Sequence, residues 1–165
     1  NHISGLNLSF KIFLMGDVSV ELIREKERFE ALFEYASMGI LVANDKGIIE
    51  MANDFLIRQF GYEHKSDLLG KQVEVLIPMR YNSGHHKHRE HYQQKPEPRT
   101  MGVGRDLFAV RKDDSEFPVE VSLSNYTTTE GNYVIAFVID ITKRKEIEND
   151  LIIFSSGHFT IMGTE

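Results

Sequence analysis

The side chains best suited to chemistry in this chain are four closely spaced histidines, His85, His86, His88 and His91. Imidazole is the side chain most readily used as a metal ligand or a proton carrier near neutral pH. The segment 81–93 that carries them predicts a helix, with a cap at Asn82 or Ser83 and Pro96 beyond its end. On such a helix His85 and His88 share one face, while His86 points elsewhere.

The residues alone allow two interpretations of this helix, a metal-binding site or a structural helix beside a pocket. His85 and His88 stand one helical turn apart, a spacing that could bind a transition metal. No carboxylate or thiolate partner is evident near them in the sequence, and we therefore predict no bare metal site. The favoured interpretation is a basic, solvent-facing helix beside a pocket whose ligand is unknown or absent.

The composition excludes several other classes of function. With a net charge of −6 the chain lacks the cationic excess that a phosphate backbone requires, so we expect no nucleic-acid partner. It has no cysteine, which rules out disulfides, thiolate metal sites and a flavin photosensor that forms a cysteinyl adduct. The longest apolar run near the start, Phe10 to Met15, is much shorter than the ~20 residues of a membrane helix. We expect a cytoplasmic location and, since residue 1 is Asn, a piece of a longer protein.

The first part of the chain predicts one helix behind a loose leader. Residues 1–17 show no sustained periodicity and contain Gly5 and Gly16, so we expect them to be poorly ordered. Over residues 18–35 an apolar stripe predicts an amphipathic helix; its residues are Leu22, Phe29, Leu32, Phe33 and Ala36. This helix either packs on its own domain or pairs with a second copy as a short coiled coil. We expect a homodimer through the flanking helices.

Residues 36–142 predict a mixed core. Residues 39–44 and 48–52 read as two strands joined by a tight turn, and Asn53 or Asp54 can cap a short helix that stops at Gly61. Apolar and polar residues alternate over 117–124, whereas 133–141 is nearly all apolar and predicts a central strand covered on both faces. The fold class is therefore α+β, with an antiparallel sheet covered by helices on one side.

Short motifs between residues 28 and 145 carry a family resemblance. They are Arg28 to Glu34, Gly47-Ile48-Ile49, Ala52-Asn53, Phe60-Gly61-Tyr62, Leu69-Gly70-Lys71, Ile77-Pro78, Met101-Gly102-x-Gly104, Arg111-Lys112-Asp113-x-Ser115-x-Phe117-Pro118 and Asp140-Ile141-Thr142-x-Arg144-Lys145. In this order and spacing the set resembles a PAS domain with its PAC segment. Asp114 stands where the family usually has glycine, and because Asp tolerates a left-handed backbone we expect the turn to survive with a small penalty.

The resemblance implies a five-stranded antiparallel sheet whose short helices enclose a pocket. It also implies a sensory or dimerising input domain of a bacterial signalling protein, such as a histidine kinase or a cyclic-dinucleotide regulator. No enzymatic activity is expected in this segment itself. The family passes its signal at the joint formed here by Asp140, Thr142 and Arg144, with residues 143–154 starting the output helix and 155–165 forming a tail. A cofactor-free dimerisation module is an alternative.

The histidine helix is also similar to the haem-bearing PAS domains of oxygen-sensing kinases. That similarity implies haem as a possible cofactor, with His85 as the iron ligand and Arg105 over the bound gas. The basic positions that serve the haem carboxylates would be His91 and Arg99. A haem-binding gas sensor is therefore a second alternative.

Overall fold

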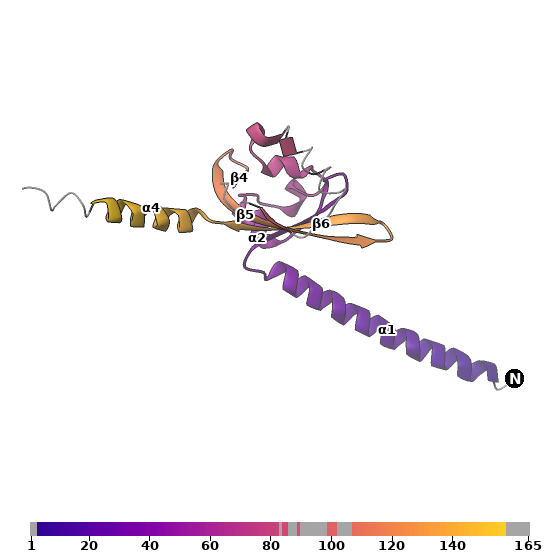
Figure 1. Ribbon diagram of the computed structural model, residues 1–165. Coiled ribbons are helices and arrows are strands. Elements are labelled where there is room, and N and C mark those ends of the chain that lie inside the picture. The colour runs from indigo at the N-terminus through magenta and orange to yellow at the C-terminus, as the bar shows by residue number, and fades with distance from the viewer. Residues whose placement is uncertain (1–2, 83, 86–88, 90–98, 102–106, 158–165) are drawn as a thin grey trace, which may run out of the picture. The chain divides into compact units, whose positions relative to one another are not determined.

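The computed structural model describes residues 3–82, 84, 85, 89, 99–101 and 107–157. The chain divides into two compact units, residues 1–36 and 37–165 (Figure 1). No helix among these described residues combines the length and apolar content needed to cross a membrane.

The first unit is one long helix, α1, which spans Ile3–Glu34. The prediction of a loose leader over residues 1–17 was therefore wrong for residues 3–17, because Gly5 and Gly16 do not interrupt the helix. A glycine inside a helix costs only about 1 kcal/mol, which its helical neighbours can outweigh. Along the C-terminal half, Phe29 and Phe33 stack with ring centroids 5.7 Å apart, and ion pairs such as Lys26–Glu30 lie on the surface.

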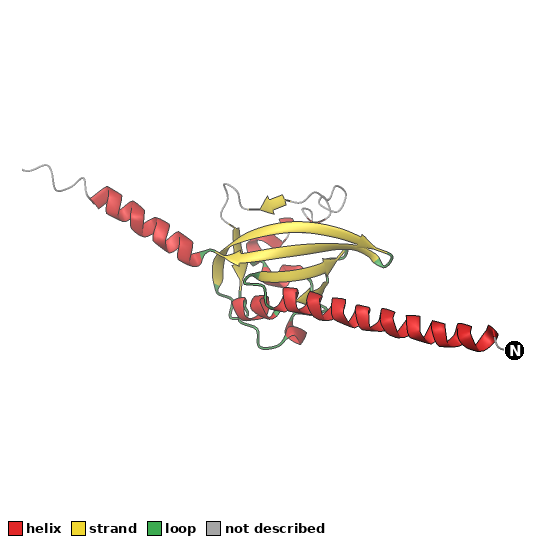
Figure 2. Ribbon diagram, turned by 90° about the horizontal axis from the view of Figure 1, so that it is seen from below, coloured by secondary structure: helices red, strands yellow, loops and turns green. Residues whose placement is uncertain are grey.

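The second unit is built on an antiparallel sheet (Figures 1 and 2). Its strands are β1 (Gly39–Asn44), β2 (Ile49–Ala52), β3 (Arg99–Met101), β4 (Leu107–Val110), β5 (Glu116–Thr128) and β6 (Gly131–Asp140). Across the sheet the order is β2-β1-β6-β5-β3, and β4 pairs with β5 as well. Since β3 pairs with residues 121–123 of β5 and β4 with residues 116–119, both occupy the same edge of β5. Five positions across the sheet result, which confirms the predicted five-stranded arrangement.

One face of this sheet carries the core. Leu41 on β1 and Val138 on β6 join one buried cluster with Leu56 and Phe60 of the helical segment and with Phe117 of β5. The helical elements on that face are α2 (Asp54–Gln59), η1 (Lys65–Asp67) and η2 (Val73–Leu76). The α+β class with helices on one face of the sheet is thus confirmed.

The opposite face of β6 differs from the prediction. Ile139 is 43% exposed, so in the described part of the chain β6 is central in the sheet but not covered on both faces throughout. The apolar run 133–141 thus correctly predicted β6 and its central place in the sheet. It did not predict whether the outer face of β6 is covered, because that depends on other parts of the fold.

Asn53 fixes the start of α2, as its sequence position suggested. Its side-chain oxygen accepts hydrogen bonds from the backbone N–H groups of Leu56 and Ile40, both at 3.0 Å. Its amide nitrogen donates to the carbonyl of Met38 at 3.0 Å. Because one buried side chain caps the helix and binds the start of β1, it sets the position of α2 over the sheet.

The turn at Asp114 has the predicted left-handed backbone, with φ of 65°. Beside it, Asp113 accepts hydrogen bonds from the backbone N–H and the hydroxyl of Ser115 at 3.0 and 2.6 Å. Asp113 and Asp114 therefore shape a turn, as expected, with Asp113 directed at Ser115.

Candidate functional site

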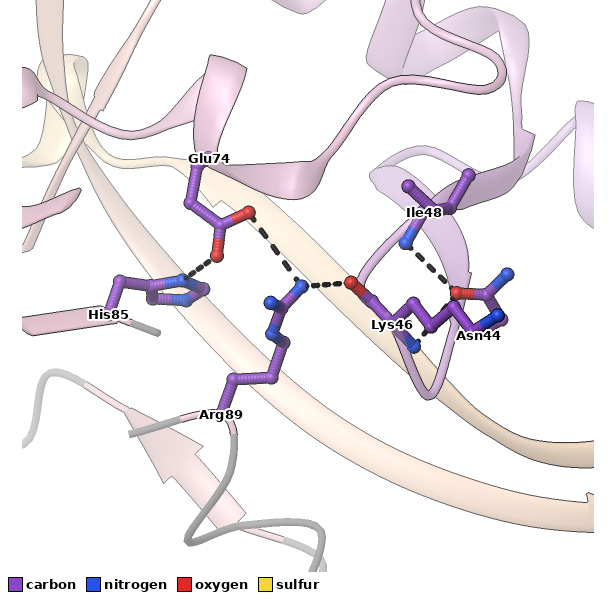
Figure 3. A network of polar contacts seen from close by, with 6 residues as sticks. All are labelled: Asn44, Lys46, Ile48, Glu74, His85 and Arg89. Carbon is purple, nitrogen blue, oxygen red and sulfur yellow. Dashed lines mark hydrogen bonds and ion pairs between the residues drawn. The ribbon is translucent and has the colours of Figure 1, made fainter. Parts of the chain in front are cut away.

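His85 lies against a buried carboxylate. Its ring Nδ1 is 3.0 Å from Oε1 of Glu74, a residue of η2 whose side chain is only 8% exposed (Figure 3). Because a carboxylate can only accept, Nδ1 carries the proton and donates to Glu74. In the neutral ring this leaves Nε2 with its lone pair, the state in which an imidazole binds a metal.

Arg89 completes the contact on Glu74. Its guanidinium nitrogen lies 3.8 Å from the second carboxylate oxygen and donates to the backbone carbonyl of Lys46 at 2.5 Å. Burial alone would raise the pKa of Glu74. The hydrogen bond from His85 and the charge of Arg89 outweigh that effect and hold the pKa of Glu74 below its usual value.

The carbonyl of Lys46 is presented by a turn that Asn44 organises. The side-chain oxygen of Asn44 accepts from the backbone N–H groups of Lys46 and Ile48, both at 3.0 Å (Figure 3). Gly47 in this turn has φ of 77°, and a Cβ atom placed there would lie 1.3 Å from the Arg89 guanidinium. The positive φ therefore favours glycine at position 47, and a Cβ atom there would also displace the end of the Arg89 side chain.

The predicted histidine helix starts earlier than expected. Helical backbone is described at residues 79–82, 84, 85 and 89, so the start at Asn82 or Ser83 was wrong. The backbone N–H of Tyr81 donates to the carbonyl of Pro78 at 2.8 Å, and Pro78, with its fixed φ, is well suited to precede a first helical turn.

The haem alternative stays a prediction, and the residues named for it can be compared with the structure only in part. His85 fits the role of an iron ligand, because its partner Glu74 leaves Nε2 available. His91 and Arg105 lie outside the described residues, and Arg99 is described only as backbone of β3. Among the described residues no group of three or more His, Cys, Asp or Glu side chains could hold a bare metal ion.

A second polar cluster lies where the sheet meets the C-terminal helix α4 (Thr142–Gly157). Asp140 ends β6, and one of its oxygens accepts from the backbone N–H and hydroxyl of Thr142 at 2.8 and 2.5 Å. The other oxygen accepts from Arg111 at 2.9 Å. Arg111 also donates to the carbonyl of Gln59 at 3.1 Å, at the end of α2.

Arg144 makes a separate contact from α4. Its guanidinium pairs with Glu120 of β5 at 2.5 Å and lies 3.9 Å from Glu148 on the next helical turn. The basic partner of Asp140 is thus Arg111 and not Arg144. Lys112 pairs with Asp67 instead, at 3.2 Å.

Sequence reasoning missed Glu74 as a partner of His85. The residue interrupts the apolar run Val73 to Ile77, and a charge inside such a run needs a partner once it is buried. That signal marks Glu74 as unusual, but it does not name the partner, which comes from another element of the fold.

Comparison with known proteins identifies the family. A family model described as the PAS fold matches residues 27–141. The PAS domain of an HTR-like protein from Haloarcula marismortui superposes with a TM-score of 0.66 and 24% identity, covering 76% of this chain and 99% of that one. For a PAS domain from Colwellia psychrerythraea the TM-score is 0.61 at 20% identity, over 72% and 97% of the two chains. The chain belongs to the PAS family, whose members serve as sensory domains of signalling proteins.

A curated relative is the sensor protein FixL of Bradyrhizobium diazoefficiens. It is 26% identical over 109 residues, which is 66% of this chain and 21% of the relative. The chain therefore spans about a fifth of the length of that relative.

Proposed function

We propose that this PAS domain is the sensory input of a bacterial signalling protein, either a histidine kinase or a cyclic-dinucleotide regulator. The segment itself would be non-enzymatic and cytoplasmic, and it would pass its state through α4 to an effector domain elsewhere in the parent protein. The similarity to a sensor protein supports the general role. The arrangement around Arg111 supports the route of the signal.

Arg111 carries this proposal because one side chain contacts both ends of the route. It holds the last carbonyl of α2, on the core side of the sheet, and the carboxylate of Asp140 that caps α4. A shift of α2 relative to the sheet would therefore change the hydrogen bonding of the first turn of α4. Arg144 and Glu120 limit that movement from the β5 side.

A chimaera tests this route. Residues 1–157 replace the input domain of a sensor histidine kinase, and autophosphorylation is measured for the parent chimaera and for Arg111→Gln and Asp140→Asn. We expect both variants to change the basal activity several-fold, with unchanged expression and folding of the chimaera. Arg58→Gln is the control, since Arg58 is an exposed arginine on α2. Equal activity in all four proteins would contradict the route.

Haem binding is the second candidate, and the state of His85 favours it. Glu74 orients the ring and fixes the proton on Nδ1, so that His85 would present Nε2 to the iron. When bound, haem would supply reversible binding of a diatomic gas. Reconstitution with haemin followed by absorption spectroscopy tests the idea. A strong porphyrin band that shifts in His85→Ala is expected, and a band that is absent or unchanged by the substitution would exclude His85 as the ligand.

A further inference from the structure

Two tyrosines stack on the outer face of the sheet, near the turn that joins β5 to β6. Tyr126 and Tyr133 are paired across the two strands, and their rings lie nearly parallel with centroids 5.1 Å apart. Ala136 and Val138 of β6 belong to the buried core, so the alternation of side chains along the strand places Tyr133 on the opposite face. The side chain of Tyr126 belongs to a residue that is 38% exposed. The pair therefore presents aromatic surface to the solvent.

Two carboxylates lie close enough to these rings to act on them. Glu50 of β2 accepts a hydrogen bond from the side chain of Asn44 at 2.8 Å, and Glu130 lies in the turn between β5 and β6. Burial raises the pKa of Tyr133, and the negative charges of Glu50 and Glu130 raise it further. Burial and the charge of Glu50 likewise raise the pKa of Tyr126. Both tyrosine hydroxyls therefore stay neutral near pH 7, beside negative charge.

Glu50 differs from the other acidic residues of the described strands in its partners. Each of the others pairs with an arginine, and the pairs are Glu116–Arg80, Glu120–Arg144 and Asp140–Arg111. Among the residues that the structure describes, neither Glu50 nor Glu130 forms an ion pair. Within this part of the chain, the negative charge beside the tyrosines is thus not matched by a cation.

Two arginines of this chain show which group completes such a combination of ring and carboxylate. The guanidinium carbon of Arg111 lies 3.8 Å from the ring centroid of Phe117, and the same guanidinium pairs with Asp140. Arg80 lies over the ring of Tyr81 at 4.6 Å and pairs with its own glutamate partner on β5. A guanidinium can make both contacts at once because it is flat, always charged and donates hydrogen bonds from its edge.

We propose that Tyr126, Tyr133 and Glu50 form a binding site for an arginine side chain of a partner protein. The guanidinium lies against the exposed ring of Tyr126 and donates to Glu50, while Glu130 adds a second negative charge. Arginine fits better than lysine, since its planar group stacks on a ring and still reaches a carboxylate. The site lies near the start of β6, whereas α4 follows the end of that strand, so it is separate from the route through Arg111.

The test is a titration of the isotope-labelled 165-residue chain with N-acetyl-arginine amide, followed by NMR through the backbone amides of residues 124–133. We expect saturable shifts of these resonances, and none with N-acetyl-citrulline amide, which has nearly the same shape without the charge. In Glu50→Gln and in Tyr126→Leu the dissociation constant should rise about threefold or more. Tyr126→Phe keeps the ring and should bind like the parent chain. Glu63→Gln, an exposed position outside the sheet, is the control for lost charge.

Several results would overturn the arginine site. One is the absence of saturable shifts in residues 124–133, and another is an unchanged dissociation constant in Glu50→Gln. That variant should fold like the parent chain because Glu50 is exposed, and unchanged resonances of β4 verify this. Equally tight binding of N-acetyl-lysine amide would also contradict the assignment to arginine. Shifts of the same residues with protein concentration alone would instead assign this surface to a second copy of the chain, against the proposal.

Discussion

Glu74 combines two opposing effects on one carboxyl group. Burial disfavours its charge, while His85 and Arg89 favour it more strongly, so its folded-state pKa is lowered. A carboxyl whose pKa is lower in the folded state stabilises the fold above its unfolded pKa, which is about 4.3 for glutamate. That stabilisation is lost as the pH falls through the lower, folded-state pKa.

This effect predicts how the stability of a Glu74→Gln variant depends on pH. Near pH 7 the variant should be less stable than the parent chain. The difference should shrink steadily below about pH 4.3, because there the carboxyl binds a proton more readily in the unfolded chain than in the folded one. Urea unfolding at a series of pH values measures it. Glu63→Gln, at an exposed position, is the matched control. Parallel curves for the parent chain and Glu74→Gln would contradict the lowered pKa.

Asn53 is the second residue on which much of the domain depends. It is fully buried, and its side chain makes hydrogen bonds to Leu56, Ile40 and Met38. Replacing it with alanine removes a helix cap and leaves a buried backbone carbonyl and N–H groups without this partner. We expect Asn53→Ala to lower the free energy of unfolding by about 3 kcal/mol. Chemical denaturation measures the change, and Asn149→Ala on the exposed face of α4 should leave stability nearly unaltered.

At the scale of elements, the turn before β5 contains one residue, Asp114, in a strained backbone conformation that a substitution could relieve. Asp114 has φ of 65°, a conformation that glycine adopts without penalty. We expect Asp114→Gly to raise stability by up to about 1 kcal/mol. The neighbouring Asp113→Gly should do the opposite, since it loses the hydrogen bonds to Ser115. Melting temperatures of the two variants that move in the same direction would refute this account of the turn.

The elements that the sequence predicted well are those whose structure depends on residues close together in the chain. The strand over 117–124 follows from alternating side chains, and the β1–β2 hairpin follows from its turn residues. The structure extends β5 to Thr128, beyond the alternation, because residues there pair across to β6 and Tyr126 stacks on Tyr133 with centroids 5.1 Å apart. Such cross-strand support cannot be read from one segment alone.

The candidate site shows the same division. His85 and Asp140 could be singled out from residue type and family position. The partners that define their state, Glu74 and Arg111, come from elements that only the fold brings near. The sequence therefore identifies His85 and Asp140 as candidates. The tertiary structure determines which ring nitrogen of His85 carries the proton and which basic residue pairs with Asp140.

At the scale of the whole molecule, association through α1 remains a prediction. Val18, Leu22 and Leu32 of this helix are 66%, 70% and 78% exposed, and they supply the apolar stripe that a coiled-coil partner would bury. We expect the chain to form a dimer of twice 19.0 kDa in light scattering. Replacing Leu22 and Leu32 with lysine should yield the monomer, while Glu27→Lys on another face should not. A monomeric parent chain would remove the proposal.

The lengths of the strands bear on aggregation. The edges of the sheet are held by short strands, with four residues in β2, three in β3 and four in β4, while the thirteen-residue β5 and ten-residue β6 are central. From Ser124 to Thr128, β5 pairs with β6 alone among the described strands, and four of those five residues are serine, asparagine or threonine. Short or polar edges offer a poor template for adding a foreign strand. Concentrated chains should therefore resist fibril growth through the sheet.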